Sequence, residues 1–336
     1  MQNEALIILN EFEKRAKNIT VIKSKKNKAV WQIRTNEGFF YLKKVPTEES
    51  FLCFILAAWN HLLGQGIGMP VPVSTPDGRE YVIKNGGKYI LMTAVTGRTP
   101  KFLTTKDRCE VIRFLASFHL ASKKFHPPLQ CRVHSQMGTL PDIYNKKHKE
   151  LLALQKRTKK SRSPLSQKLL AHAPHFIHSI ERASLILTES NYDKVCKSSE
   201  YRVLAHRDFV PHNIKRSANG ELYVIDTDLL TFNLPCQDIR KLITNLLKNQ
   251  NTLNRQMIIT MLKSYHKVSK LNMPLLKILQ AELEFPYLFC SLTSDYIHKA
   301  TDAREDRYIQ RLNAILQYEK KKKYLLRDFA EIIQHF

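Results

Sequence analysis

The chain has 336 residues, of which 43% are hydrophobic, and 54 Lys and Arg against 30 Asp and Glu give it a formal net charge of +24. This length and apolar content are ample for a packed core, which excludes a disordered chain and favours a fold in two parts. The positive charge favours acidic partners. Six cysteines are scattered without a C-x-x-C pair, so we expect no zinc site, no redox motif and a reduced, intracellular chain.

No signal peptide or transmembrane helix is expected. The N-terminus carries Asn3, Glu4 and Glu11 around a short apolar run, unlike the basic start of a secretory signal. The longest apolar run, at 51–59, is too short to span a bilayer.

The excess positive charge is concentrated in four basic runs. Such runs are typical of solvated faces or loops, and the alternative is attraction to nucleic acid, anionic surfaces or acidic proteins. A nucleic-acid partner is disfavoured because the runs lack interleaved aromatic residues, although it stays open. The runs are KSKKNK at 23–28, KKHK at 146–149, KRTKKSR at 156–162 and KKKK at 320–323.

The first part of the chain predicts a small sheet with two helices. Apolar spacing indicates an amphipathic helix over 2–17 and a second helix over 48–63. Runs rich in β-branched and aromatic residues predict the strands, and Asn85-Gly86-Gly87 is a strong hairpin turn. The expected strands are 19–22, 29–34, 39–45, 80–84 and 88–95.

Strand 39–45, FFYLKKV, has the form of a strand that presents one lysine to the phosphates of a nucleotide. Alternation lets only one of Lys43 and Lys44 face inward, and alignment with V-A-I-K selects Lys43. The alternative is a charge on an edge strand. After the last strand, the backbone of the crossing segment 93–97, at Thr93 and Val95, is the candidate for holding adenine, unless the segment is a plain linker.

Two features expected of an active kinase are missing. In a glycine-rich loop the backbone contacts the phosphates of the nucleotide, but residues 23–28, at the corresponding place, contain no glycine. The sequence GQGIG at 64–68 lacks the G-x-G-x-x-G spacing. The helix that should supply a glutamate to Lys43 has only Glu48 and Glu49, at its very start. Both features favour loss of catalysis.

From residue 104 the chain is nearly all helix, with an insert at about 124–200 that contains one basic loop. His119, on an apolar helix face, is expected to be a satisfied core histidine rather than a ligand. The expected helices are 104–123, 142–160, 173–189, 239–248, 255–268, 275–299 with a bend near Pro286, and 304–336.

The stretch 201–242 carries the strongest signal. Its loop HRDFVPHN matches H-R-D-x-x-x-x-N, in which the Asp accepts the proton of an attacking hydroxyl and the Asn holds Mg²⁺. Asp208 is therefore the catalytic candidate and Asn213 a metal candidate. A hairpin follows and ends on Asp226, the expected main metal ligand. Alternatively, these residues cap a turn and close a strand.

Three residues are expected to support this site. His206 opens the loop motif, and Asp228 either helps a second metal or is a solvated strand end. Asp238 opens an amphipathic helix and resembles the buried Asp that braces the backbone of the catalytic loop. Arg207 stands where small-molecule kinases usually have a small residue.

Together these segments resemble the CotS family of spore-coat-associated proteins, in the aminoglycoside phosphotransferase and choline kinase branch of the protein-kinase-like fold. The resemblance implies an α+β, two-lobed fold, with a small antiparallel-sheet lobe at 1–95 and a helical lobe at 96–336. It also implies a cytoplasmic (mother-cell) protein of a spore-forming bacterium that joins the coat. The segments are 28–45 (KAVWQIRTNEGFFYLKKV), 89–98 (YILMTAVTGR), 115–122 (LASFHLAS), 206–213 (HRDFVPHN) and 222–229 (LYVIDTDL).

Two functions follow as hypotheses. The first is an ATP- and Mg²⁺-dependent phosphotransferase that acts on a hydroxyl. The second is a scaffold of the coat that keeps the fold and binds acidic partners or other coat proteins through its basic surface. The retained Lys43, Asp208, Asn213 and Asp226 favour the first, and the missing glycines favour the second. The phosphate acceptor does not follow from the fold.

Overall fold

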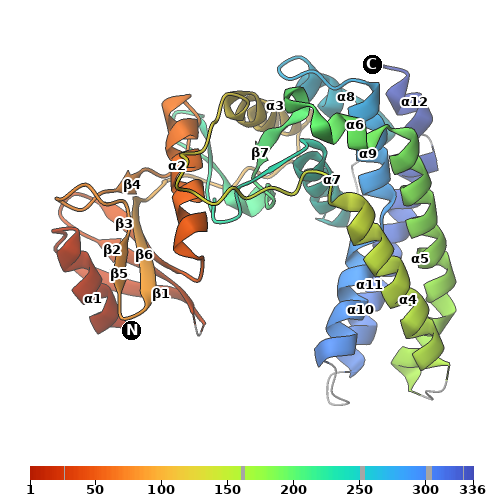
Figure 1. Cartoon of the computed structure of the whole chain (residues 1–336), viewed down its shortest axis with the longest axis horizontal. Helices are drawn as coiled ribbons and strands as arrows, with labels where there is room; N and C mark the ends of the chain where they lie inside the picture. Colours follow the sequence, from red (N-terminus) through yellow and green to blue (C-terminus); the bar gives the residue numbers. More distant parts are fainter. Residues whose placement is uncertain (26, 160–162, 250–253, 300–304, 328) are drawn as a thin grey trace. The chain divides into compact units, whose positions relative to one another are not determined.

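The computed structural model describes residues 1–25, 27–159, 163–249, 254–299, 305–327 and 329–336 (Figure 1). Lys26 of the first basic run and residues 160–162 of the third fall outside this range, as do residues 304 and 328 of the last predicted helix. The chain forms two compact units. Unit 1 comprises Met1–Phe102, Lys124–His134 and Asp208–Thr231, and unit 2 comprises Leu103–Lys123, Ser135–Arg207 and Phe232–Phe336.

Unit 1 is built on a six-stranded antiparallel sheet with the order β1-β2-β3-β6-β4, in which β5 also pairs with β6. The predicted strands are found, and β4 was not predicted because it is only two residues long. The strands are β1 (Asn18–Lys25), β2 (Lys28–Arg34), β3 (Phe39–Val45), β4 (Pro72–Val73), β5 (Val82–Lys84) and β6 (Gly87–Thr93).

One face of this sheet packs against α1 (Gln2–Glu11). Side chains alternate along a strand, so Trp31 and Ile33 of β2 and Leu42 of β3 point to this face and are fully buried with the apolar side of α1. In Figure 1, α2 (Glu49–Gly64) lies on the opposite side of the sheet from α1. The predicted first helix ran to residue 17, but α1 ends at Glu11 and Glu13 has a positive φ of 52°.

A disulfide joins Cys53 of α2 to Cys131 in the segment 124–134. The two cysteines are 78 residues apart in sequence, with Cα atoms 5.3 Å apart. The expectation of a fully reduced chain is therefore wrong for this pair. No local pattern marks the bond, because only the packing of the segment on α2 brings the two sulfurs together. Cys109, Cys196, Cys236 and Cys290 are free.

The motif-bearing part of unit 1 is a loop followed by a hairpin, as predicted. A short turn, η2 (Pro211–Asn213), leads into β8 (Ile214–Arg216), which pairs antiparallel with β9 (Leu222–Val224). The hairpin packs so closely on Gly68, also in unit 1, that a side chain there would clash. A Cβ added at Gly68 would lie 2.4 Å from the Leu222 carbonyl oxygen. Unit 1 therefore extends past residue 95 to Phe102 and also contains residues 208–231, which the sequence assigned to the helical lobe.

Unit 2 is mostly helical. Figure 1 shows α4 and α5 side by side and antiparallel, and the short strands β7 (Val203–Ala205) and β10 (Thr231–Asn233) pair with each other. The helices are α3 (Thr105–Ser122), α4 (Leu140–Thr158), α5 (Pro164–Glu189), α6 (Tyr192–Lys197), α7 (Cys236–Asn249), α8 (Arg255–His266), α9 (Met273–Glu284), α10 (Tyr287–Lys299), α11 (Glu305–Arg327) and α12 (Phe329–Ile333).

Several helix boundaries differ from the prediction for physical reasons. The Ser163 side chain accepts a hydrogen bond from the Ser166 N–H and caps α5, which starts nine residues earlier than expected and continues through Pro174. Phe285 adopts an extended conformation just before Pro286, so the expected bent helix is two helices, α9 and α10. Among the described residues, no helix has the length and apolar character needed to cross a bilayer.

Candidate active site

The loop motif of unit 1 brings Asp208 and Asn213 together. The Asn213 Nδ2 donates hydrogen bonds to the Asp208 main-chain oxygen at 2.9 Å and to its Oδ2 at 3.0 Å. Asn213 is buried, and its own carbonyl accepts from the Ile225 N–H at 2.9 Å, on the strand segment that leads to Asp226. The predicted catalytic residue and the two predicted metal ligands are therefore linked through one short network.

Asp226 follows the hairpin and is held by Lys43 of β3. The Lys43 Nζ donates to the Asp226 Oδ1 at 2.6 Å. Asp226 has a positive φ of 66°, an uncommon conformation for a residue with a side chain, and such conformations cluster at functional sites. Lys44 instead pairs with Glu4 of α1 at 2.8 Å, on the other face of the sheet, so the choice of Lys43 as the inward lysine is confirmed.

Asp228 is the second partner of Lys43, at 2.9 Å from Nζ to Oδ1. Its other oxygen, Oδ2, accepts from the Nζ of Lys28 on β2 at 3.0 Å. Burial alone would raise the pKa of the Asp228 carboxyl, but the charges of Lys43 and Lys28 outweigh it and the pKa is lowered. Burial would lower the pKa of Lys43, but Asp228 and Asp226 raise it on balance. Both groups are therefore charged at neutral pH.

These four side chains form a line of alternating charge: Lys28, Asp228, Lys43 and Asp226. The side chains of Lys43 and Asp228 are each only 11% exposed, whereas Asp226 is 44% exposed. The alternative of a solvated strand end at Asp228 is thus wrong. Asp226 is the carboxylate that is open to a ligand.

In unit 2, Asp238 of α7 is fully buried and braces the backbone that precedes Asp208. Its Oδ2 accepts from the His206 N–H and its Oδ1 from the Arg207 N–H, both at 2.7 Å. His119 of α3 lies 3.1 Å from the Asp238 Oδ2 through Nε2 and 2.7 Å from the Tyr265 hydroxyl through Nδ1. Asp238 thus contacts the two amides that it was expected to hold, and His119 has a partner at each ring nitrogen, as expected of a core histidine. A supporting role of Asp238 at the site stays a prediction.

Burial would raise the pKa of the Asp238 carboxyl, but its contact with His119 and its backbone hydrogen bonds lower it overall. The braced residue Arg207 has a positive φ of 66°. Burial lowers the pKa of its guanidinium, and Asp238 opposes that shift only in part. The carboxylate thus fixes a backbone conformation that an L-residue rarely adopts, immediately before the catalytic candidate.

The structure leaves the glutamates of α2 away from Lys43. Glu48 pairs with Arg132 at 3.3 Å, and Glu49 accepts from the Tyr81 hydroxyl at 2.6 Å. Their positions at the first turn of the helix explain this outcome. The partners of Lys43 are the two aspartates after the hairpin.

In the crossing segment, the Thr93 N–H donates to the Val71 carbonyl at 2.9 Å, and the Thr93 hydroxyl accepts from the Val71 N–H. The Ala94 N–H donates to the Phe39 carbonyl at 3.0 Å. Both amides are used within the sheet. The Thr93 N–H is therefore not available to adenine, and the expectation for the Thr93 carbonyl and the Val95 backbone stays a prediction.

The residues around Asp226 fit a magnesium ion. Carboxylate and amide oxygens are the ligands this ion prefers, and Mg²⁺ usually takes only one or two protein carboxylates and completes its shell with water and phosphate oxygens. Asp226 is accessible, and the Asn213 amide group is fixed by Asp208. In the described part of the chain, no group of three or more His, Cys, Asp or Glu could hold a metal by itself.

Lys28 is the site residue that the sequence patterns missed. It lies in a basic run that was interpreted as a loop, and its partner is 200 residues away. Its position at the start of β2, on the same strand face as Val30 opposite Lys43, was the signal available.

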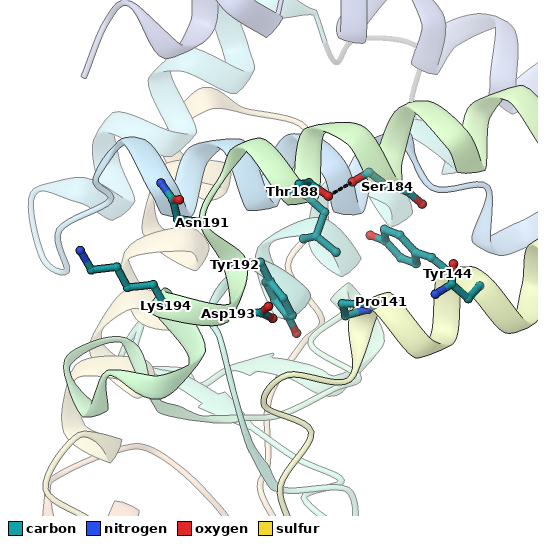
Figure 2. Close-up of a pocket in the computed structure, with 10 residues that line it drawn as sticks. Pro141, Tyr144, Ser184, Thr188, Asn191, Tyr192, Asp193 and Lys194 are labelled. Carbon is teal, nitrogen blue, oxygen red and sulfur yellow. Dashed lines mark hydrogen bonds between the residues drawn. The ribbon is translucent and has the colours of Figure 1, made fainter.

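A pocket of about 420 Å³ in unit 2 contains none of the predicted site residues. Figure 2 shows it between the start of α4, the end of α5 and α6. The Tyr192 ring points toward the start of α4, where its hydroxyl accepts from the Leu140 N–H at 3.4 Å. The lining of the pocket mixes aromatic rings with the hydroxyls of Ser184 and Thr188, and it shares no residue with the network of Lys43, Asp208 and Asp226.

Comparison with known proteins decides the family. A family model described as "Spore coat putative kinase YutH" matches residues 14–329. The chain belongs to this family. Spore coat protein S of Bacillus subtilis (strain 168) is 23% identical to this member of the spore coat kinase family over 328 residues, covering 97% of this chain and 93% of that protein. The resemblance drawn from the motifs is therefore confirmed.

Solved structures show that this spore coat kinase family member has the kinase-like fold. An aminoglycoside phosphotransferase from Alicyclobacillus acidocaldarius has a TM-score of 0.79 at 15% identity, covering 98% of this chain and 96% of that one. A microcompartment-associated aminopropanol kinase gives 0.67 at 14% identity and 99% coverage of both chains. A spectinomycin phosphotransferase in complex with ADP and spectinomycin gives 0.66 at 13% identity, covering 100% and 98%.

Proposed function

We propose that this member of the spore coat kinase family is an ATP- and Mg²⁺-dependent phosphotransferase that acts on a hydroxyl. The observation that supports the proposal is the 2.6 Å contact between Lys43, the lysine proposed to bind phosphate, and Asp226, the carboxylate proposed to hold the metal. Asp208 and Asn213 are joined to the same network through Ile225. The nucleotide complex of a structural relative supports nucleotide binding.

Each residue has a role in this mechanism. Lys43 binds the α- and β-phosphates, and Asp226 and Asn213 hold the metal ion, which would neutralise charge on the phosphates. Asp208 accepts the proton of the acceptor hydroxyl at a carboxylate oxygen, while the Asn213 amide fixes its orientation. Asp238 keeps the preceding backbone in place through the His206 and Arg207 amides.

Thermal unfolding with and without Mg-ATP tests this function. Ligand that binds only the folded state raises the melting temperature by mass action. We expect a rise at millimolar Mg-ATP, a smaller rise with ATP and EDTA, and loss of the Mg²⁺-dependent part in Asp226→Ala. Asp193→Ala, which removes an exposed carboxylate on α6, is the matched control. No shift for the wild type would refute nucleotide binding.

The second candidate function is a scaffold of the spore coat. It is favoured by the lack of glycine in residues 23–28 and by the absence of a contact between Lys43 and the described glutamates of α2. A scaffold would bind acidic coat proteins through its charge of +24, and this binding would weaken steeply with salt. Poly-glutamate binding that is present at low salt and lost at high salt, together with no response to Mg-ATP, would favour the scaffold.

We also propose that the protein joins the spore coat from the mother-cell cytoplasm. The family and the spore coat protein S of Bacillus subtilis support association with the coat. A fluorescent fusion followed through sporulation tests this: the signal should start in the mother cell and collect around the forespore. Signal confined to the forespore interior would contradict it.

A further inference from the structure

The face of the sheet that carries Lys43 carries three more lysines. Lys43 lies directly opposite Val30 on β2, and Lys28, two residues before Val30, points to the same face. On β1, Lys23 lies opposite Val30 and Lys25 opposite Lys28. Residues directly opposite each other in a sheet project to the same side. Lys23, Lys25, Lys28 and Lys43, here the lysine face, therefore point away from α1.

A β-bulge produces this arrangement. Val21 pairs with Trp31, whose side chain is buried on the α1 face. Regular alternation would turn Lys23 and Lys25 to that same apolar face. The register instead shifts between Val21 and Lys23, because Ile22 is an extra residue, and both lysines change sides. Without the bulge, both lysines would lie on the α1 side of the sheet, away from Lys28 and Lys43.

The lysine face carries an excess of positive charge. Asp228 and Asp226 balance Lys28 and Lys43, as the distances of 2.6 to 3.0 Å show. Lys23 and Lys25 are exposed on the same face, beyond Lys28. The face thus offers cationic donors beside the carboxylate that would hold the metal.

We propose that Lys23, Lys25 and Lys28 bind the phosphates of the nucleotide, in place of the backbone amides that a glycine-rich loop would supply. The inference rests on the proposed function and names the phosphate-binding side chains of its site. The β1–β2 hairpin has no glycine in residues 23–28, so its backbone is not built for the close approach that such loops make. Each ammonium instead offers three donors on a flexible stem, which suits a phosphate chain.

Lys28 would exchange a carboxylate partner for a phosphate oxygen. Without nucleotide it donates to the Asp228 Oδ2 at 3.0 Å, and its side chain is 35% exposed. With nucleotide, it would turn toward a phosphate oxygen while Lys43 stays on Asp228. Affinity should therefore rise with the number of phosphates, from AMP to ADP to ATP, and fall steeply with salt.

Calorimetry with ATP, AMP and inorganic tripolyphosphate tests the proposal. We expect K23Q/K25Q/K28Q to weaken ATP and tripolyphosphate binding by on the order of a hundredfold, K28Q alone by about tenfold, and AMP binding much less. K28R, which keeps the charge, should restore most of the affinity. The control K146Q/K149Q/K168Q removes the same net charge from exposed positions on α4 and α5 and should leave binding unchanged.

The outcomes separate the two proposals. If the lysine-face variant and the control lose the same affinity for ATP, the effect comes from overall charge and the proposal for the lysine face is wrong. The proposal is also wrong if neither variant loses affinity. If wild type binds neither ATP nor AMP but binds tripolyphosphate through the three lysines, the nucleotide function fails and the lysine face stands. If wild type binds ATP and the variant binds it equally well, the lysine face fails and the function stands. Circular dichroism of each variant checks its fold.

Discussion

The Nζ of Lys43 lies 2.6 Å from the Oδ1 of Asp226, although the two residues are 183 positions apart in the sequence. The phosphate-binding candidate thus holds the metal-binding candidate in place before any ligand arrives. The Lys43 ammonium beside Asp226 orients this carboxylate. A metal ion held by Asp226 would share this carboxylate with Lys43.

Lys43→Ala should weaken Mg-ATP binding by on the order of tenfold to a hundredfold, because it removes a charge-assisted contact with the phosphates. Calorimetry measures the affinity directly. Lys44→Ala, on the same strand but paired with Glu4 on the other face, is the matched control and should bind as wild type does. Equal affinities in all three proteins would show that Lys43 does not touch the nucleotide.

Asp208→Asn keeps the size of the side chain while removing the proton acceptor. Nucleotide affinity should survive, whereas transfer of phosphate, or slow hydrolysis of ATP to water, should fall by on the order of a hundredfold or more, the range for loss of a general base. Phosphate release under single-turnover conditions is the measurement. Hydrolysis at the wild-type rate in Asp208→Asn would mean that Asp208 has no catalytic role.

Asp228→Asn should reduce the free energy of unfolding by about 3 kcal/mol at pH 7, because it leaves two lysines without their shared partner. Since the folded pKa of Asp228 is lowered, its contribution is fully present above the unfolded pKa of about 3.9 and is lost as pH falls through the folded pKa. The difference between wild type and variant should therefore be constant from pH 7 to 5 and shrink below about pH 4. Urea unfolding at each pH measures it, and an unchanged difference at pH 3 would contradict the charged pair.

The bond between Cys53 and Cys131 should stabilise the protein by about 4 kcal/mol, from closure of a loop of 78 residues. C53S/C131S should lose this stability and become insensitive to reductant, while reduction of the wild type should reproduce the variant. Mass spectrometry after alkylation in denaturant should find four modified cysteines without reductant and six with it. Six modified cysteines in the untreated protein would rule out the bond.

Local sequence patterns were enough to define most elements and the order of the motifs. Alternation and the match to V-A-I-K selected Lys43 over Lys44, and turn residues placed the hairpin that ends before Asp226. The expectation for Asp238 came from its resemblance to a buried Asp of the kinase-like fold, and Asp238 contacts the His206 amide as expected. These features depend on periodicity and on residues close together in the chain, which local patterns encode.

Only the tertiary structure shows which charged side chains contact one another. The contacts of Lys43 and Lys28 with Asp228 join residues 185 and 200 positions apart, and no local pattern specifies such pairs. The side of the sheet to which Lys23 and Lys25 point depends on one extra residue, Ile22, and a shift of one residue reverses every side chain after it. Register is fixed by the pairing of whole strands, so the lysine face exists only in the folded sheet.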